Sequence, residues 1–581
     1  MIFIGLYLCY SLAILFVLGL LTGKALGNIL KISSPYHSLG FVNTVLLGIV
    51  SLTTIISFIS LILPVDTTIH LIILSCLLVY AFLDRQYIVS VIKELLVTFK
   101  NHKAFVAIGG GWVLGGLVYA SGEVTAYDTG LYHAQSVKWL NEYGVVPGLG
   151  NLHFRLAFNS SWLVFSGFFD ILAFDGKSYH LINLLLFVVG TVICIKGFVN
   201  IVNNKIKISS LLSCLLILYL FISFLNVPSL STDFPATTLV LYILILVIEL
   251  IEKKESEKED LEQGKELKLY YVLVALFSFF AITIKLSVIP IILFLPFLLF
   301  GVLKKEYRQL ITISLVAGII VLLPYVFRNL ILSGYFVFPV PQPTFFSFDW
   351  RVPYEQVLLI KQDTYYWAIV PGSDFVRVPN MDFVEMFQIW VKARFIRNIR
   401  FSIFLVLTPL LFIPILLLCY KGKLKNCKNI IIIQGILLSG VLFWLISAPD
   451  PRLGAGWIIS FGLFPMAVLS YYVLGVKQPD WKFFTNQYLI YVVLIIFCAW
   501  LGRVALYHVP IFEGDLNLIW TIEELPEADL ETVEIYEGFN IYVPQGNNRV
   551  WDAELPNTPY VNYNLQMRGD TLEDGFRVVE E

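Results

Sequence analysis

Charged residues are scarce in this sequence. Asp, Glu, Lys and Arg together make up 14% of its 581 residues, whereas soluble domains carry about 25%. Hydrophobic residues make up 58%, and the mean hydropathy is +0.80. A chain with so many apolar side chains has too few polar ones to cover a water-exposed surface. The composition therefore predicts an all-α polytopic membrane protein.

The sequence also lacks the motifs of soluble nucleotide and zinc enzymes. It contains no GxxxxGK[ST], GxGxxG or HExxH pattern and no paired CxxC motif. Its seven cysteines fall in apolar stretches or in a lysine-rich loop, so no disulfide framework is visible. A net charge of -2 gives no electrostatic basis for binding nucleic acid. Any chemistry has to come from other residues.

Apolar runs long enough to cross a bilayer recur along the chain. A helix needs about 20 apolar residues for this, and that length predicts about 14 transmembrane helices, the first of which starts at residue 2 and is retained. Loops rich in lysine and arginine favour the cytoplasmic side. The 14-helix arrangement puts every such loop there, namely 84–103, 196–207, 252–268, 304–308 and 421–428. Both termini are then predicted to be extracytoplasmic.

This arrangement divides the chain into three regions. Residues 1–103 hold the N-terminal transmembrane helices, and residues 104–504 form a transmembrane core with large outer loops at 122–177 and 332–400. Residues 505–581 form an acidic extracytoplasmic C-terminal domain, for which we expect a small α/β fold docked on the outer loops. Alternating residues at 531–543 predict one or two strands there.

Asp128 opens an amphipathic stretch that follows a predicted span on the outer side. The pattern from Thr129 predicts a helix lying at the membrane interface. Asp128 is either the cap of this helix or a carboxylate that acts as general base or metal ligand. His133 lies five positions later, a spacing that does not share a helical face with Asp128, so hydrogen bonding or packing is favoured over a joint metal site.

A second acid, Asp233, occupies a short outer turn with the sequence "VPSLSTDFPATT". It caps the next helix, a role for which Ser231 and Thr232 compete, or it takes part in a site. Asp233 and Asp128 are predicted to face the same compartment at membrane level. Two carboxylates at one bilayer surface favour a shared site.

Three basic residues stand where basic residues are unusual. Lys285 interrupts an uncharged hairpin at 271–303 that must break near it, where a charge costs about 2.5–3.5 kcal/mol on insertion scales. Arg328 ends a span on the outer side, and Arg452 lies in the outward turn "APDPRLGAGW". Each arginine either snorkels or pairs with a neighbour such as Asp450, or it clamps a phosphate or pyrophosphate.

The order of these residues resembles that of GT-C glycosyltransferases. In that fold one acid lies in the first outer loop and a second acid lies in the outer turn between the third and fourth core spans. If 104–121 is the first core span, Asp128 matches the first acid and Asp233 matches the second. The segments "RNLILSGYFVFP" (328–339) and "PDPRL" (449–453) resemble an Arg-Asn…Gly…Pro segment and a late Pro-x-Arg turn of bacterial members.

More narrowly, the chain resembles a group of bacterial multi-pass proteins assigned to surface-polysaccharide pathways. The stretches "YDTGLYH", "WDAELPNTP" and "RGDTLEDGF" carry it, and it covers most of the chain from about residue 104. The sequence departs from the GT-C pattern in its extra N-terminal helices, 1–103, and in lacking a DxD or Glu-Glu in the first loop. The resemblance places the protein in the bacterial cytoplasmic membrane.

The resemblance implies transfer of a sugar from a polyprenyl-phosphate donor to a glycan, lipid or protein acceptor at the extracytoplasmic face, among membrane lipids and without nucleic acid. Asp128 would take the acceptor proton and Asp233 would position the substrate. The remaining residues implied to bind substrate or lipid phosphate are Lys285, Arg328, Arg452 and His133. No cofactor is required, and a divalent metal ion, if one is used, would bind at Asp128 and Asp233.

Three other functions fit parts of the sequence. A flippase or transporter of lipid-linked sugars would need charge at mid-depth and repeated halves, but the sequence shows no internal repeat and its polar candidates gather at one surface. A polysaccharide polymerase or ligase would share the outer arginines without needing the paired acids. A structural assembly factor would need none of these residues.

Overall fold

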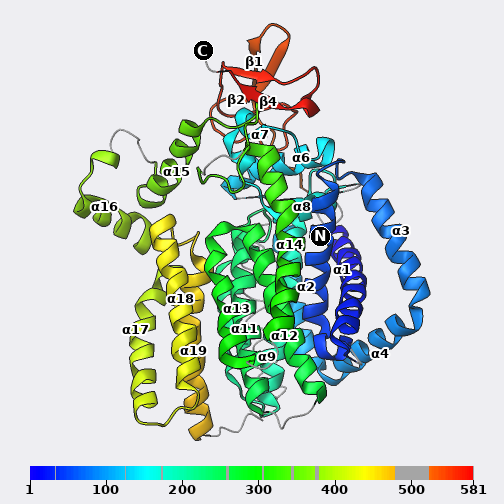
Figure 1. The fold of residues 1–581 in the computed structure, drawn as a ribbon, viewed down its shortest axis with the longest axis vertical. Coiled ribbons are helices and arrows are strands. Elements are labelled where there is room, and N and C mark those ends of the chain that lie inside the picture. Colours follow the sequence, from blue (N-terminus) through cyan, green and yellow to red (C-terminus); the bar gives the residue numbers. More distant parts are fainter. Residues whose placement is uncertain are drawn as a thin grey trace, which may run out of the picture.

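The structure is a computed structural model that describes residues 1–579 except 33–34, 125, 172–173, 257–260, 304–306, 342–345, 373–377 and 478–522. It is mostly helical, and Figure 1 shows long helices packed side by side in a bundle. A small domain of β-strands, formed by the C-terminal residues, lies at one end of the bundle (Figure 1). The prediction of a mostly helical, multi-pass architecture is confirmed.

The long helices follow one another along the chain. The first five are α1 (Ile2–Leu30), α2 (Pro35–Ile59), α3 (Thr67–Leu83), α4 (Arg85–Asn101) and α5 (Lys103–Ala120). The next five are α9 (Ile182–Val202), α10 (Ile208–Ile222), α11 (Asp233–Ser256), α12 (Leu261–Ile284) and α14 (Tyr307–Ser333). The last three are α17 (Ile399–Tyr420), α18 (Cys427–Ser447) and α19 (Ala455–Lys477).

Short helices fill the two large loops. The loop between α5 and α9 contains a π turn η1 (Thr129–His133), α6 (Ala134–Tyr143), α7 (Leu149–Leu152), a 3-10 turn η2 (Phe154–Ala157) and α8 (Ser161–Phe168). The loop between α14 and α17 contains α15 (Tyr354–Ile369), α16 (Phe383–Trp390) and a π turn η9 (Val391–Ile396). The first loop lies between the bundle and the strand domain, whereas α15 and α16 extend to the side (Figure 1).

Ten described segments are long and apolar enough to cross a membrane, and the bent pair α3–α4, whose axes meet at 87°, would make an eleventh. The predicted count of 14 is not confirmed. The stretch 208–226 forms the 15-residue helix α10, which is shorter than a full span. The stretch 287–303 divides into a 3-10 segment, a single turn α13 (Phe294–Pro296) and a π segment. The apolar stretch 486–504, which is one of the 14 helices counted from the sequence, lies outside the described residues.

The predicted hairpin breaks at Lys285. This residue has an extended backbone conformation, with φ −155° and ψ 124°, directly after the last residue of α12. The chain then continues as the 3-10 segment η6 (Leu286–Leu293), which contains Pro290. Since proline lacks the N–H that an α-helix needs, it helps to exclude a continuous helix here. The break places the Lys285 side chain at the end of α12, where it pairs with Asp233.

The lysine-bearing loops gather at the end of the bundle opposite the strands (Figure 1). Lys196 forms an ion pair with Glu249 at 2.7 Å, and Ser38 donates a hydrogen bond to Glu266 at 3.0 Å. The first contact joins α9 to α11, and the second joins α2 to α12. Positive charge concentrated at one end of a bundle is what a cytoplasmic orientation of that end would require. The orientation itself stays a prediction.

The C-terminal domain is built from strands. Strands β1 (Leu530–Tyr536) and β2 (Phe539–Pro544) form an antiparallel pair, which confirms the prediction for 531–543. A second antiparallel pair joins β3 (Leu565–Met567) to β4 (Phe576–Val578). The prediction of an α/β fold was wrong for residues 523–579, which contain no α-helix and a single 3-10 turn at Leu572–Asp574. Frequent prolines and glycines keep each element there short.

This domain docks on the two large loops, 122–177 and 332–400. The N–H of Phe576 donates to the carbonyl of Pro147 at 2.9 Å, and Arg568 forms an ion pair with Asp349 at 2.8 Å. Trp551 is 5% exposed and packs in a cluster with Val137 and other side chains of the first large loop. The association therefore combines apolar packing of a tryptophan with hydrogen bonds and an ion pair.

We expect Trp551→Ala to loosen the C-terminal domain. Removing a buried aromatic side chain costs roughly 3–5 kcal/mol, and here the loss falls on the contact between domain and loop. Trypsin should therefore cut near Arg549 and Arg568 faster in purified variant than in wild type. Tyr563→Ala, in which the replaced side chain is 70% exposed, serves as the control and should digest at the wild-type rate. Equal rates for all three proteins would contradict the docking.

Candidate functional site

Four charged side chains meet at the end of the bundle that carries the strands. Arg452 lies 3.2 Å from a carboxylate oxygen of Asp128 and 3.3 Å from one of Asp233. Lys285 forms a further ion pair with the other oxygen of Asp233. We call these four residues the charge cluster. The guanidinium of Arg452 thus bridges the two carboxylates, and the ammonium group of Lys285 pairs with one of them.

Each member of the charge cluster comes from the end of a different element. Asp128 precedes the π turn η1, and Asp233 is the first residue of α11. Lys285 follows α12, and Arg452 lies in the turn between α18 and α19. Helix ends leave polar backbone groups and side chains free of the apolar helix surface. The bundle therefore gathers its charge at one level.

The side chains of the charge cluster remain partly open. Arg452 is 42% exposed and Asp128 is 25% exposed, whereas Asp233 and Lys285 are 13% and 20% exposed. Asp128 makes no capping hydrogen bond to the backbone of the following turn. Its alternative role as a helix cap is therefore not what the structure shows, since its carboxylate is turned toward Arg452.

His133 lies closer to Asp128 than the sequence suggested. We expected an α-helix from Thr129, in which a spacing of five separates the two residues, but Thr129–His133 forms a π turn. The N–H of Ala134 bonds to the carbonyl of Thr129, five residues back. The wider turn carries position i+5 back toward position i. His133 is consequently near enough to Asp128 for its protonated form to lower the pKa of the Asp128 carboxyl.

The pKa values in this loop follow from burial and from Arg452. Burial is the largest single effect on Asp128 and raises its pKa, but the positive charges of Arg452, protonated His133, Arg155 and Lys285 together outweigh it, and the net pKa lies below the usual value. Burial lowers the pKa of His133 to about 4. Asp128 is therefore ionised at neutral pH, and His133 is neutral with its Nδ1 atom lacking a hydrogen-bond partner among the described residues.

Arg155 is a neighbour of Asp128 that the sequence analysis missed. It lies in the 3-10 turn η2, its positive charge helps to lower the pKa of Asp128, and its guanidinium stands 6.0 Å from the ring of Tyr132. Next to it, His153 is 2% exposed and neither ring nitrogen has a partner in the described structure. Unpartnered polar groups in a buried place are unusual. Such groups mark places where water, an ion or another polar ligand can bind.

Arg452 is held in place from behind by Asp450. One oxygen of Asp450 accepts the backbone N–H of Arg452 at 2.9 Å, and the other pairs with Arg394 at 2.9 Å. Trp367 lies against both guanidinium groups, 4.2 Å from that of Arg394 and 5.8 Å from that of Arg452. Arg394 belongs to the amphipathic stretch 383–401, whose pattern predicts a helix at the membrane interface, yet this side chain is 8% exposed and pairs with Asp450.

The C-terminal domain supports the turn that holds Asp128. The N–H groups of Val550 and Trp551 both donate to the carbonyl of Gly130 at 2.9 Å, and the side-chain amide of Gln135 donates to the carbonyl of Trp551 at 3.0 Å. A Cβ atom at Gly130 would stand 2.7 Å from the Trp551 ring, so only glycine fits there. The π turn is thus anchored by residues from the other end of the chain.

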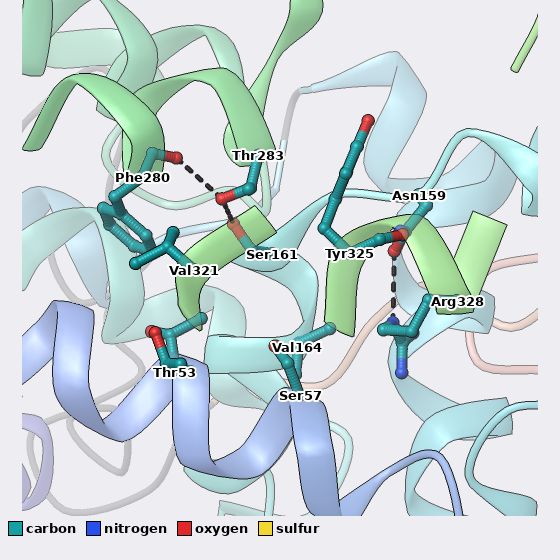
Figure 2. Close-up of a pocket in the computed structure, with 11 residues that line it drawn as sticks. Thr53, Ser57, Asn159, Ser161, Val164, Phe280, Thr283, Val321, Tyr325 and Arg328 are labelled. Carbon is teal, nitrogen blue, oxygen red and sulfur yellow. Dashed lines mark hydrogen bonds between the residues drawn. The ribbon is translucent and has the colours of Figure 1, made fainter. Parts of the chain in front are cut away.

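Arg328 does not join the charge cluster. It is 7% exposed in α14, and its guanidinium donates to Asn159 at 3.2 Å and to Ser60 at 2.6 Å. It lines a small cavity that Figure 2 shows in close-up. Of the predicted substrate-binding residues, the structure therefore brings Lys285, Arg452 and His133 near the two acids and leaves Arg328 apart.

The charge cluster does not fit a divalent metal ion. Both carboxylates already face cationic side chains, and a metal would have to displace Arg452 from Asp128 and Asp233. In the described parts of the chain, no three His, Cys, Asp or Glu side chains stand together as ligands would. The residues present suit an anion better than a cation.

A family model described as a domain of unknown function (DUF8201) matches residues 1–459. The chain belongs to this family. No curated protein and no solved structure matches it. The DUF8201 region contains all four members of the charge cluster, whereas the anchor at 550–553 lies beyond it.

Asp170 is a buried acid in the same loop that the sequence analysis did not single out. Its carboxylate accepts the N–H of Ser178 at 2.7 Å and that of Gly176 at 3.3 Å. Burial raises its pKa to about 7 despite the bonds from Ser178, and the carboxyl groups of Asp552 and Asp175 add to the shift. Between about pH 4 and 7 the carboxyl group of Asp170 is therefore protonated in the folded protein and ionised in the unfolded chain.

The raised pKa of Asp170 predicts a pH dependence of stability. Between about pH 4 and 7 the folded state binds more protons at this residue than the unfolded state, so its contribution to stability falls as the pH rises. Asp170→Asn cannot ionise, and its unfolding temperature should depend less on pH in this window. Thermal unfolding in detergent across pH 4–8 measures this. Parallel curves for variant and wild type would contradict it.

A double-mutant cycle tests the ion pair between Lys285 and Asp233. We expect Lys285→Met to lower the free energy of unfolding by roughly 2–3 kcal/mol, less than the loss of a fully buried partner costs, because Arg452 stays beside Asp233. Adding Asp233→Asn to the Lys285→Met variant should lower the free energy of unfolding by less than Asp233→Asn does in the wild-type background. Unfolding in detergent measures both, with the exposed Lys361→Met as control. Strictly additive losses would rule out the pairing.

Proposed function

We propose that the protein is a glycosyltransferase of the GT-C type that moves a sugar from a polyprenyl-phosphate donor to an acceptor at the extracytoplasmic face of the bacterial cytoplasmic membrane. The observation that carries the proposal is the charge cluster, in which Arg452 joins Asp128 to Asp233. Two acids and two cations at one end of an apolar bundle supply a base and a phosphate site together. Their order along the chain supports the same assignment.

The balance of charge favours an anionic ligand. Asp128 and Asp233 offset Arg452 and Lys285, while Arg155 adds a positive charge nearby and His133 is neutral. The site thus carries a surplus positive charge, which the single negative charge of a sugar phosphodiester would neutralise. An arginine that is 42% exposed is free to turn from a carboxylate toward such a group.

Arg452 links donor binding to the activation of the base. In the resting protein its charge keeps the pKa of Asp128 low, so the carboxylate is a weak base. A donor phosphate that draws the guanidinium away removes this effect and raises the pKa of Asp128. The base would gain strength only when a donor is bound, which limits wasteful reaction with water.

The transfer is a single displacement at the anomeric carbon. Asp128 takes the proton of the acceptor hydroxyl as its oxygen bonds to the anomeric carbon, and the bond from that carbon to the phosphate oxygen breaks. The polyprenyl phosphate leaves with the bonding electrons, so its negative charge increases. Arg452 and Lys285 stabilise that charge, and Asp233 keeps both cations in place.

Asp128→Asn is the first test of this mechanism. The amide cannot accept the proton, so we expect transfer to fall by about 10²–10⁴-fold. The assay follows label from a panel of radiolabelled polyprenyl-phosphate sugars in membranes that contain wild type or variant. Transfer by wild type also identifies the donor.

The control is Glu123→Gln, which removes an exposed acid from the same loop. This variant should transfer label at the wild-type rate. No transfer from any donor by wild type, or equal transfer by wild type and Asp128→Asn, would refute the proposal. Either result would favour a flippase or a polysaccharide polymerase.

A further inference from the structure

Helix α4 lies across the end of the bundle instead of along it. Its axis meets that of α3 at 87°, and Figure 1 shows it turning from the lower end of α3 toward α1. At the corner between the two helices, Asp84 forms an ion pair with Lys24, which lies toward the end of α1. Glu94 of α4 pairs with His37, at the start of α2, at 3.2 Å. These contacts hold α4 at the end of the bundle opposite the strand domain.

The neighbours of α4 along the chain show that it does not cross the bundle. Helix α3 starts beside the first large loop, because the N–H of Val65 donates to the carbonyl of Leu140 at 3.1 Å. Helix α5 ends beside the same loop, where the carbonyl of Ala120 accepts a hydrogen bond from Nδ1 of His180. Each of these helices therefore passes along the bundle once, in opposite directions, and α4 remains at the far end. With 17 residues, α3 is at the lower limit of length for one crossing.

One face of α4 is apolar and only partly covered. Ile88 and Val91 on this face are buried in the core of the bundle. Next to them, four apolar side chains at helical spacing form an exposed stripe: Val89, Ile92, Leu96 and Phe99, which are 47%, 42%, 59% and 41% exposed. Val97 is the one exposed apolar side chain of α4 outside this stripe. A contiguous exposed apolar surface of this kind is typical of a contact with lipid or with a partner.

Basic side chains border the exposed stripe. Lys93 and Lys100 each lie one turn after a member of the stripe, and Arg85 lies one turn before its first member. All three are exposed and have no acidic partner among the described residues. Glu94, the one acid of α4, lies on the opposite side of the helix, toward His37. Positive charge is therefore concentrated beside the apolar stripe, and negative charge is kept away from it.

Helix α3 depends on α4 for its position. Only Ile69, His70 and Leu77 of α3 are buried, and all three lie in the part of the helix that is nearer the first large loop. The part nearest α4 exposes four large apolar side chains: Leu78, Val79, Phe82 and Leu83, which are 58–75% exposed. The lower end of α3 is therefore positioned by the corner at Asp84 and by α4.

We propose that α4 binds the surface of the membrane leaflet at this end of the bundle, with its exposed stripe among the lipid chains and Arg85, Lys93 and Lys100 at the phosphates of anionic lipids. A helix parallel to the bilayer plane, with an apolar face and basic residues beside it, binds membranes in this way. Each cation near an anionic surface adds to the attraction. The unpaired cations beside the stripe favour a lipid surface over a protein partner.

This assignment changes the interpretation of residues 84–103. The sequence predicts a cytoplasmic loop there, whereas the proposed element lies in the headgroup layer, and the predicted orientation makes this the cytoplasmic leaflet. Because α3 is held at its lower end by α4, its position would depend on the charge of the lipids. The surface lies at the opposite end of the bundle from the charge cluster, so it does not depend on the proposed sugar transfer.

Hydrogen–deuterium exchange of the full-length protein, with one copy in each lipid nanodisc, tests the proposal. Two sets of nanodiscs are compared, one of phosphatidylcholine and one in which part of it is replaced by phosphatidylglycerol. We expect the amides of α4 to exchange more slowly in the anionic nanodiscs, because binding to the surface opposes local opening of the helix. Added salt should remove the difference, since it screens the attraction between exposed charges.

Two pairs of variants separate charge from apolar contact. Lys93→Gln/Lys100→Gln should exchange roughly tenfold faster than wild type in anionic nanodiscs, whereas Lys421→Gln/Lys423→Gln, which removes two exposed lysines from another loop at the same end, should exchange as wild type. Leu96→Gln should speed exchange in both lipids. Its control is Ser90→Gln, on the polar side of α4, which should leave exchange unchanged.

The amides of α12 report whether each variant is folded, because α12 is buried in the bundle and should exchange equally in all of them. If a lysine variant fails this check, the salt dependence of wild type still decides the question. Equal exchange of α4 in both lipids, with or without salt, would overturn the proposal. Slow exchange in native membranes but not in either nanodisc would show that a protein partner covers the stripe, and would also reject it. Loss of sugar transfer by Asp128→Asn bears only on the charge cluster.

Discussion

The bridge from Arg452 to Asp128 and Asp233 is the interaction on which the functional end of the molecule depends. Removing charges from water is costly, and each charge is tolerated because its partner is close. The start of α11, the end of α12, the turn before α19 and the π turn must therefore come together at the same time. The apolar bundle supplies the framework, but the ion pairs fix the relative positions of these helix ends.

Support for this bridge comes from outside the apolar bundle. Asp450 holds the backbone of Arg452 and also binds Arg394 from the second large loop. The carbonyl oxygen of Gly130, two residues after Asp128, accepts two hydrogen bonds from the C-terminal domain. A functional site needs its reactive groups held by such surrounding contacts, because a small displacement changes both pKa and reach. Both large loops and the C-terminal strands thus contribute to one site.

The sequence was sufficient for features that depend on local composition. Apolar length located ten of the spans, and a lone charge with a nearby proline located the break at Lys285. The sequence did not reveal the other neighbours of the charge cluster, because Arg155 and Trp367 lie in loops whose folding depends on distant contacts. The proximity of Asp128 and His133 was missed because the helical spacing of the residues did not reveal that the chain opens with a π turn, which is rare. Arg328 was chosen for sound chemistry, but only the packing of α2 against α14 shows that it lies in its own cavity.

The anchor on Gly130 has a consequence for the way the protein is made. The side chain of Gln135 and its partner Trp551 are separated by 416 residues, so the turn that holds Asp128 is synthesised long before the segment that fixes it. During that interval the helices can insert and pack while the acid remains unanchored. Completion of the chain, rather than insertion of the helices, would then decide when the protein becomes competent.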